Sequence, residues 1–370
     1  MDKTLPFAMT LPDITPVSRS TSLRISIARV LCIVLVTFVH VQPGIAENVY
    51  TQPVDAFGLV YFLLTRVIGL SSVSLLGIVS GLLIAGSLTK GPLSTITSKV
   101  RSLVVPLIAW NVVMFVLIII YAQLSGNWEK LPEASPLGIA NAFLALREWP
   151  LVVPLWFLRD LFVCSLLAPL LVSALWRAPT ATFALLIGYM LFGQDTWLLQ
   201  RPQLLLFFAI GLWLRIGAFN DDQIDRVTKV FTLGLAPMAA IFFYIRIEGI
   251  PLNSLNPQFL AALDTLLRIT TAATIWQVTL LIAGSRIWSR IKHFEPYVFV
   301  LFCSHAIVFE FAGIPLRRVF GNFGDPLFSI SFFLQQLIAI AAAWIGVMIL
   351  MRLPAAVGKA LNGGKVRLSS

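Results

Sequence analysis

Residues 102–122 read SLVVPLIAWNVVMFVLIIIYA, a run of 21 residues without a charged side chain. A helix of about 20 apolar residues spans the hydrocarbon core of a bilayer, because each residue adds about 1.5 Å along the axis. The rest of the chain has the same character: 58% of its 370 residues are hydrophobic and only 12% are charged. A soluble domain carries about 25% charged residues. The composition therefore excludes a soluble globule and predicts an integral membrane protein.

Ten apolar segments of this kind occur, and we expect each of them to cross the membrane. Their approximate bounds are 23–43, 57–86, 102–122, 152–174, 180–194, 202–218, 228–246, 259–284, 296–313 and 326–351. Backbone amides at hydrocarbon depth must be bonded within their own segment, and nothing alternates with the two-residue period of a barrel strand. The fifth and sixth segments are short. The sequence thus predicts an all-α, polytopic bundle of about ten transmembrane helices.

The basic residues predict the orientation of this bundle. Sixteen Lys and Arg side chains fall in the two tails and in alternate loops, against six on the opposite side. Because cytoplasmic loops carry the excess of basic residues, we expect both termini in the cytoplasm. Three regions follow: a cytoplasmic tail over 1–22, the transmembrane domain over 23–351, and a second cytoplasmic tail over 352–370.

The net charge of +10 does not indicate a nucleic-acid partner, because a membrane protein gathers basic residues in its cytoplasmic loops. The three cysteines all lie inside apolar runs without metal-ligand spacing, so we expect neither a metal nor a disulfide. An acidic cluster, Asp221, Asp222 and Asp225 beside Arg226 and Lys229, is expected to be a solvated loop.

Three arginines, Arg66, Arg159 and Arg268, fall well inside predicted spans. An intramembrane arginine costs at least about 2.5 kcal/mol to insert, so it normally faces a polar interior and a partner. All three are expected at about 10 to 15 Å below the outer surface, which predicts a common cavity. The alternative is a purely structural role, because Asp160 and Asp264 are close enough in sequence to form internal salt bridges with them.

His40 is a second polar feature, on the first predicted helix. It follows Arg29 by 11 residues, so the two side chains share one helix face about 16 Å apart along the axis. A single buried histidine would suit a packing role. A second one, His305, lies at similar depth in the ninth segment, which favours a chemical role, because imidazole can take a proton from a hydroxyl near neutral pH. His293 lies in a basic loop and is expected to be solvated.

Five stretches in this order carry a family resemblance. They are Arg29-x10-His40, LLGIVSGLL over 75–83, Lys99 and Arg101 ahead of Pro106, LWFL over 155–158 and YVFVLFCSH over 297–305. Together they resemble the acyltransferase-3 family, membrane enzymes that O-acylate sugars and envelope polysaccharides. The second stretch lacks the family's aromatic residues, and Lys99 stands where an arginine is expected. We see no fused esterase-like domain in the sequence and therefore expect the membrane part to carry out any chemistry.

The resemblance implies a membrane O-acyltransferase of the bacterial inner membrane. The donor would be acyl-CoA, either succinyl-CoA or acetyl-CoA, and the acceptor a hydroxyl of an exopolysaccharide, nascent or lipid-linked. Composition and architecture are similar to those of the rhizobial exopolysaccharide members, which include succinoglycan succinyltransferases. Three cavity arginines favour succinyl slightly, since they suit a carboxylate. Besides these substrates and the bilayer, polysaccharide-assembly proteins are candidate partners.

The resemblance also suggests residue roles. His40 is expected to be the general base, Arg29 to bind donor phosphate or orient the thioester, and His305 to assist or hold the acceptor. Lys99 and Arg101 are candidate donor contacts. Arg66, Arg159 and Arg268 would bind either a succinyl carboxylate or the pyrophosphate of a lipid-linked acceptor.

A transporter or flippase of an anionic glycolipid is the alternative function, because buried arginines in a polar cavity also suit transport. Such folds are built from inverted repeats with matching broken helices. The two halves of this sequence show no such repeat, which favours the enzyme. A noncatalytic partner of polysaccharide export would not need the buried histidines and arginines.

Overall fold

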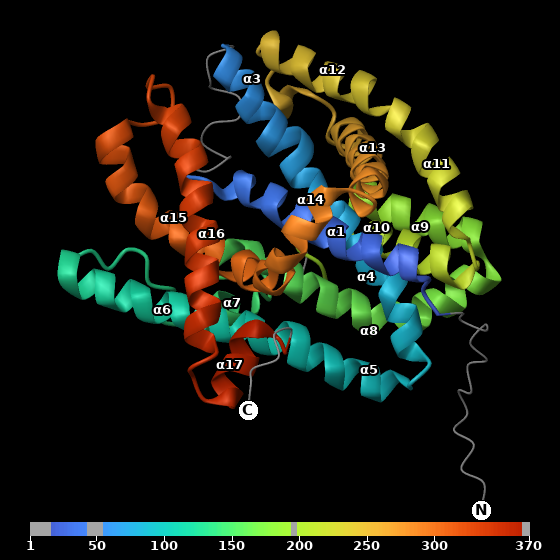
Figure 1. The fold of residues 1–370 in the computed structure, drawn as a ribbon, viewed down its shortest axis with the longest axis horizontal. Helices are drawn as coiled ribbons and strands as arrows, with labels where there is room; N and C mark the ends of the chain where they lie inside the picture. The colour runs from blue at the N-terminus through green and yellow to red at the C-terminus, as the bar shows by residue number, and fades with distance from the viewer. Residues whose placement is uncertain (1–15, 43–54, 194–197, 365–370) are drawn as a thin grey trace, which may run out of the picture.

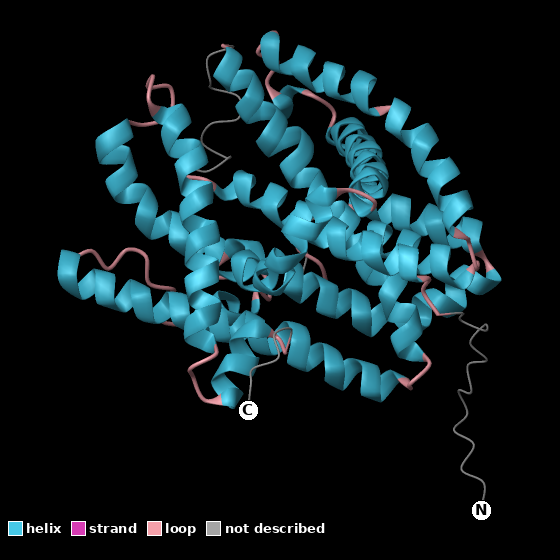
Figure 2. Ribbon diagram, in the orientation of Figure 1, coloured by secondary structure: helices cyan, strands magenta, loops and turns pink. Residues whose placement is uncertain are grey.

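The computed structural model describes residues 16–42, 55–193 and 198–364, and every regular element within these ranges is a helix (Figure 2). The α-helices are α1 (Arg19–Thr37), α3 (Ala56–Phe62), α4 (Leu70–Leu88), α5 (Pro92–Lys99), α6 (Val105–Ser125), α7 (Pro136–Leu144), α8 (Trp156–Arg177), α9 (Pro179–Phe192), α10 (Gln203–Ile216), α11 (Asp221–Leu233), α12 (Leu235–Ile247), α13 (Pro257–Ala283), α14 (Arg286–Ile291), α15 (Val298–Phe320), α16 (Phe328–Leu350) and α17 (Ala355–Asn362).

Eight helical stretches in the described ranges are long and apolar enough to cross a bilayer. They are Arg19–His40, Ala56–Leu88, Pro92–Ser125, Val153–Arg177, Asp221–Ile247, Pro257–Ala283, Arg286–Phe320 and Phe328–Leu350. The helices α9 and α10 are also apolar but shorter, as the sequence predicted for the fifth and sixth segments. The all-α membrane bundle is thus confirmed. The number of crossings and the side of the termini stay predictions.

Short π and 3-10 segments interrupt several helices near polar residues. A π segment, Leu63–Gly69, joins α3 to α4 and carries Arg66, and a second one, Val100–Val104, joins α5 to α6 and carries Arg101. The last turn of the first helix, Phe38–His40, is a 3-10 turn. Such irregular turns are frequent at functional sites, because they redirect side chains that a regular helix would hold elsewhere.

The bundle is arranged around α1, which crosses the middle of the view in Figure 1 and packs against α4, α13 and α15. On one side α15 pairs with α16, and on the other α11 and α12 pack against α13. The helices α4 and α10 lie along each other and also contact α8. The inner faces of α1, α4, α8, α10 and α15 therefore surround the interior of the bundle.

Two glycines allow α4 and α10 to touch backbone to backbone. A Cβ atom placed on Gly81 would lie 1.9 Å from the Phe208 carbonyl oxygen, and one placed on Gly211 would lie 1.8 Å from the Ile78 carbonyl oxygen. Without Cβ atoms the two backbones can approach closely, as small residues allow between membrane helices. Gly81 of the 75–83 stretch thus has a packing reason.

Replacing Gly81 with valine is expected to prevent this contact and to abolish the folded, monodisperse protein. A Cβ atom placed on Gly86 of the same helix would meet no other atom within 4 Å, so Gly86→Val should fold like the wild type and serves as the matched control. Size-exclusion profiles and thermal unfolding in detergent measure both. Equal behaviour of the two variants would contradict the assigned role of Gly81.

The acidic cluster near 221–225 is not the solvated loop that the sequence suggested. Asp221 and Asp225 lie on α11 and bind the start of α1. Asp221 accepts hydrogen bonds from Ser18 and Thr21, and the Arg24 guanidinium lies 2.7 Å from an Asp225 carboxylate oxygen and 4.2 Å from the Trp276 ring centroid. The prediction failed because the partner, Arg24, lies 201 residues away in the sequence.

Candidate active site

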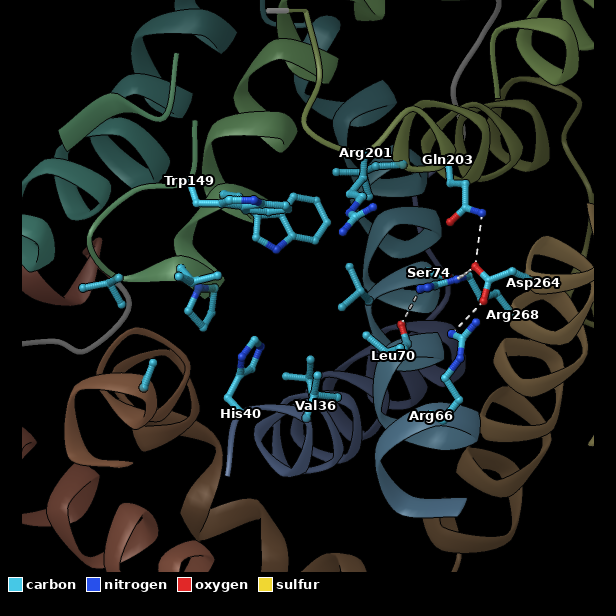
Figure 3. Close-up of a pocket in the computed structure, with 18 of the residues that line it drawn as sticks. Val36, His40, Arg66, Leu70, Ser74, Trp149, Arg201, Gln203, Asp264 and Arg268 are labelled. Atoms are coloured by element: carbon cyan, nitrogen blue, oxygen red, sulfur yellow. Dashed lines mark hydrogen bonds and ion pairs between the residues drawn. The ribbon is translucent and has the colours of Figure 1, made fainter. Parts of the chain in front are cut away.

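A cavity of about 790 Å³ lies between α1, α4, α10, α13, α15 and the segment before α8 (Figure 3). We call it the histidine cavity, because His40 lines it. Arg66, Arg268 and Asp264 form a charged cluster on one side of it, and Trp149 and Arg201 lie across it from His40. Its size is within the range of about 300–1,000 Å³ that is usual for small-molecule sites.

The two predicted site histidines come together in the structure. The ring centroids of His40 and His305 lie 5.2 Å apart, although 265 positions separate the residues in the sequence. His305 is fully buried on α15, while His40 is partly exposed and faces the cavity. This pairing is what the similar depth of the two residues suggested.

Hydrogen bonding assigns the protonated nitrogen of His305. Its Nδ1 lies 2.7 Å from the Phe302 carbonyl oxygen and 3.1 Å from that of Leu301. Carbonyl oxygens only accept, so Nδ1 carries the hydrogen in the neutral ring and Nε2 carries the lone pair. Within the described chain Nε2 is buried and has no hydrogen-bond partner. His305 therefore keeps one unsatisfied acceptor beside His40.

The charged cluster consists of two guanidiniums that share one carboxylate. An Arg66 nitrogen lies 2.8 Å from Asp264 Oδ1, and Arg268 Nε lies 2.6 Å from Asp264 Oδ2. Arg268 also donates to the carbonyl oxygen of Leu70, just after the first π segment, and Gln203 donates to the same carboxylate as Arg268. The cluster keeps a net charge of +1, because two cations face one anion. It can therefore stabilise a further negative charge at the cavity wall.

Arg159 does not join this cavity, so the expectation of one cavity for all three arginines holds only for Arg66 and Arg268. Arg159 instead bonds Asp160 at 2.9 Å and the carbonyl oxygens of Leu198 and Leu146 at 2.7 and 3.3 Å. Similar depth did not imply a common cavity, because the side chain of Arg159 turns toward two loops instead.

A second cavity of about 460 Å³ lies beside the middle of α1, and we call it the arginine cavity because Arg29 lines it. Lys99 lines it too, together with Lys292 and Glu295 of the segment before α15. Arg101, the other candidate donor contact, is exposed and does not line this cavity. Three cations against one carboxylate make this cavity suitable for a polyanion.

The two cavities are stacked along the same helices. Residues one turn apart line one cavity and then the other: Ile33 and Val36 on α1, Leu76 and Val73 on α4, Phe302 and Ala306 on α15. Adjacent residues do the same on α10, where Phe208 lines the arginine cavity and Phe207 the histidine cavity. A thin apolar partition therefore separates Arg29 from His40, which the sequence had placed on one polar stripe.

The sequence did not point to Trp149, Arg201 or Gln203 as part of the site. Trp149 and Arg201 lie in two loops, and Gln203 begins α10. Their position depends on tertiary contacts between two loops, for which no sequence period exists. Among the described residues, no group of three or more His, Cys, Asp or Glu side chains has the arrangement of a metal site.

Comparison with known proteins agrees with this architecture. The Acyl_transf_3 family profile, described as an acyltransferase domain, matches residues 23–352. The chain therefore belongs to the acyltransferase-3 family and is a multi-pass membrane acyltransferase.

A curated relative is the "Succinoglycan biosynthesis protein ExoH" of Rhizobium meliloti (strain 1021). It is 26% identical over 293 residues, which cover 77% of each chain. No solved structure matches the chain.

Proposed function

We propose that this protein transfers a succinyl group from succinyl-CoA to a hydroxyl of a bacterial exopolysaccharide, or of its lipid-linked precursor, at the inner membrane. Family membership and the similarity to a succinoglycan biosynthesis protein support the acyl transfer and the polysaccharide acceptor. The main observation that supports the proposal is the pair of stacked cavities. One cavity suits a phosphorylated donor and the other contains the candidate base.

The donor is assigned to the arginine cavity. Coenzyme A is too polar to cross a bilayer, and its phosphates suit the cations Arg29, Lys99 and Lys292. With both termini cytoplasmic, as the basic loops predict, this cavity faces the compartment that holds acyl-CoA. The pantetheine arm would then pass through the partition and bring the thioester to His40.

The reaction itself is assigned to the histidine pair. A neutral histidine takes the proton from the acceptor hydroxyl while the hydroxyl oxygen attacks the thioester carbonyl carbon. The new ester bond forms as the carbon–sulfur bond breaks, and the coenzyme thiolate leaves and takes up a proton. His40 is the proposed base, because it faces the cavity. His305, 5.2 Å away and with its lone pair on Nε2, can hold the acceptor hydroxyl or relay the proton.

The charged cluster favours succinyl over acetyl. Its net charge of +1 suits the free carboxylate of a succinyl group, and the guanidinium is a planar donor that matches a carboxylate. An acetyl group has no charge for Arg66 and Arg268 to bind. The preference for succinyl over acetyl would then arise because, with acetyl bound, the net positive charge of the cluster has no substrate carboxylate to bind.

Mass spectrometry of exopolysaccharide tests the proposal in cells that lack this chain. Complementation with wild type should restore a succinyl mass that the deletion loses, whereas Arg29→Ala should restore little of it, because donor binding is weakened. Arg19→Ala is the matched control, since Arg19 lies on the same helix but is exposed and outside both cavities.

Two results would contradict the proposal. Restoration of an acetyl mass would remove the succinyl assignment. An unchanged acylation pattern, with reduced export or accumulated lipid-linked intermediates, would favour the transporter alternative.

A further inference from the structure

Trp149 and Arg201 form a second polar region of the histidine cavity, separate from the charged cluster. The guanidinium carbon of Arg201 lies 5.2 Å from the Trp149 ring centroid, and both side chains line the cavity opposite His40 (Figure 3). Trp149 also meets Trp156 edge to face, with ring centroids 6.1 Å apart. Trp149 is 39% exposed and lines the cavity, and an indole ring is a surface on which a sugar ring or a cation can stack.

A buried polar network fixes this region in place. The Asp160 carboxylate, which is fully buried, accepts the backbone N–H groups of Gln200 at 3.1 Å and Arg201 at 3.0 Å. The buried Gln200 side chain donates in turn to the carbonyl oxygens of Ala145 and Glu148, at 3.1 and 3.2 Å. These bonds join the loop that carries Trp149 to the loop that carries Arg201.

Arg159 and Asn111 complete the network. Arg159 donates to Leu146 in the first loop and to Leu198 in the second, and Asn111 accepts the Val152 N–H group at 2.8 Å. Charged and amide groups at such depth are costly unless they are fully bonded. Their use here to hold two loops together indicates that the relative position of Trp149 and Arg201 matters.

The charges of the histidine cavity indicate what this region binds. Three guanidiniums line the cavity, those of Arg66, Arg201 and Arg268, against the carboxylates of Asp264 and Glu310. Glu310 is additionally paired with Lys130, which lies outside the cavity lining. The cavity lining therefore contains more cationic than anionic side chains, and the cations are the two arginines of the charged cluster and Arg201.

We propose that Arg201, held against Trp149, binds the negative charge of an anionic acceptor glycan. This inference rests on the proposed transfer to a glycan and names the class of acceptor. The charge is a carboxylate on a sugar or the diphosphate of a lipid carrier, both of which a guanidinium binds well. Binding there leaves the charged cluster for the acyl group and places the acceptor across the cavity from His40.

The test measures glycan binding by the full-length protein in nanodiscs. The probes are hexaglucuronate and cellohexaose, which share a β-1,4 glucose-type backbone and differ in their carboxylates, and geranyl diphosphate for the lipid-carrier charge. Wild type should bind at least one anionic probe at least about tenfold more tightly than cellohexaose. Arg201→Gln should bring this ratio close to one and leave cellohexaose binding unchanged. Arg147→Gln is the matched control, because Arg147 is exposed on the same loop as Trp149 and does not line the cavity.

The probe that loses affinity identifies the source of the charge, a sugar carboxylate or a diphosphate. A wild type that binds all three probes equally, or an Arg201→Gln variant that keeps the discrimination, overturns the inference. Release of coenzyme A from succinyl-CoA is followed in the same nanodiscs. Discrimination without transfer overturns the proposed function alone, and transfer without discrimination overturns this inference alone.

Discussion

Replacing His40 with alanine is expected to lower acyl transfer by about 10²- to 10⁴-fold, the usual contribution of a general base. His40 faces the cavity beside the buried His305, and in the proposed mechanism its removal takes away the group that accepts the hydroxyl proton. The rate is measured as release of the coenzyme A thiol from succinyl-CoA by purified protein in the presence of acceptor. Folding should be unaffected, because the His40 side chain is partly exposed at the cavity wall.

His293→Ala is the control for this prediction, because His293 is exposed in the short 3-10 segment before α15 and lies in neither cavity. Its rate should equal that of the wild type. A His40→Ala variant that keeps most of its activity would rule out the role of His40. If His305→Ala alone then abolished transfer, the base would be His305, whose lone pair on Nε2 is already suitably placed.

The second large effect is expected on stability, at Asp264. Its carboxylate is buried and pairs with Arg66 at 2.8 Å and with Arg268 at 2.6 Å. Asp264→Ala leaves two guanidiniums facing each other without an anion, and breaking a buried pair in this way costs about 3–5 kcal/mol. We expect a large fall in the thermal unfolding midpoint, or loss of the folded protein.

Lys130→Met is the control for the stability effect of Asp264→Ala. Lys130 pairs with Glu310, but its side chain is 44% exposed, and exposed pairs contribute only about 0–1 kcal/mol. The thermal unfolding midpoint of Lys130→Met in detergent should stay close to that of the wild type. A midpoint for Asp264→Ala that is equally close to wild type would show that the charged cluster is not needed for the fold.

The helices were predictable from the sequence because the bilayer imposes a simple rule on composition and length. Each of the ten predicted segments overlaps a helix in the structure, including the short α9 and α10. The sequence predicted a similar depth for His40 and His305, and the structure adds that their rings lie against each other. Depth, however, does not fix the direction of a side chain around the helix axis.

The unpredicted features all depend on direction or on distant partners. Arg159 turns toward two loops, and Asp160 accepts the backbone N–H of Arg201, whose side chain lines the cavity. The π segment that carries Arg66 shifts the helix register, and no period in the sequence marks it. Asp225 meets Arg24 across 201 positions. Such contacts follow from the packed bundle rather than from any local pattern.

The thin partition between the two cavities also has an electrical consequence. A protein hollowed from both sides concentrates the membrane voltage over the short apolar layer that remains, here about one helical turn on α1, α4 and α15. Moving one elementary charge through 100 mV is worth about 2.3 kcal/mol. Under the proposed function and orientation, a succinyl carboxylate passing outward from the arginine cavity would move in the direction in which a negative cell interior drives anions. Acyl transfer would then proceed faster in an energised membrane than in a depolarised one.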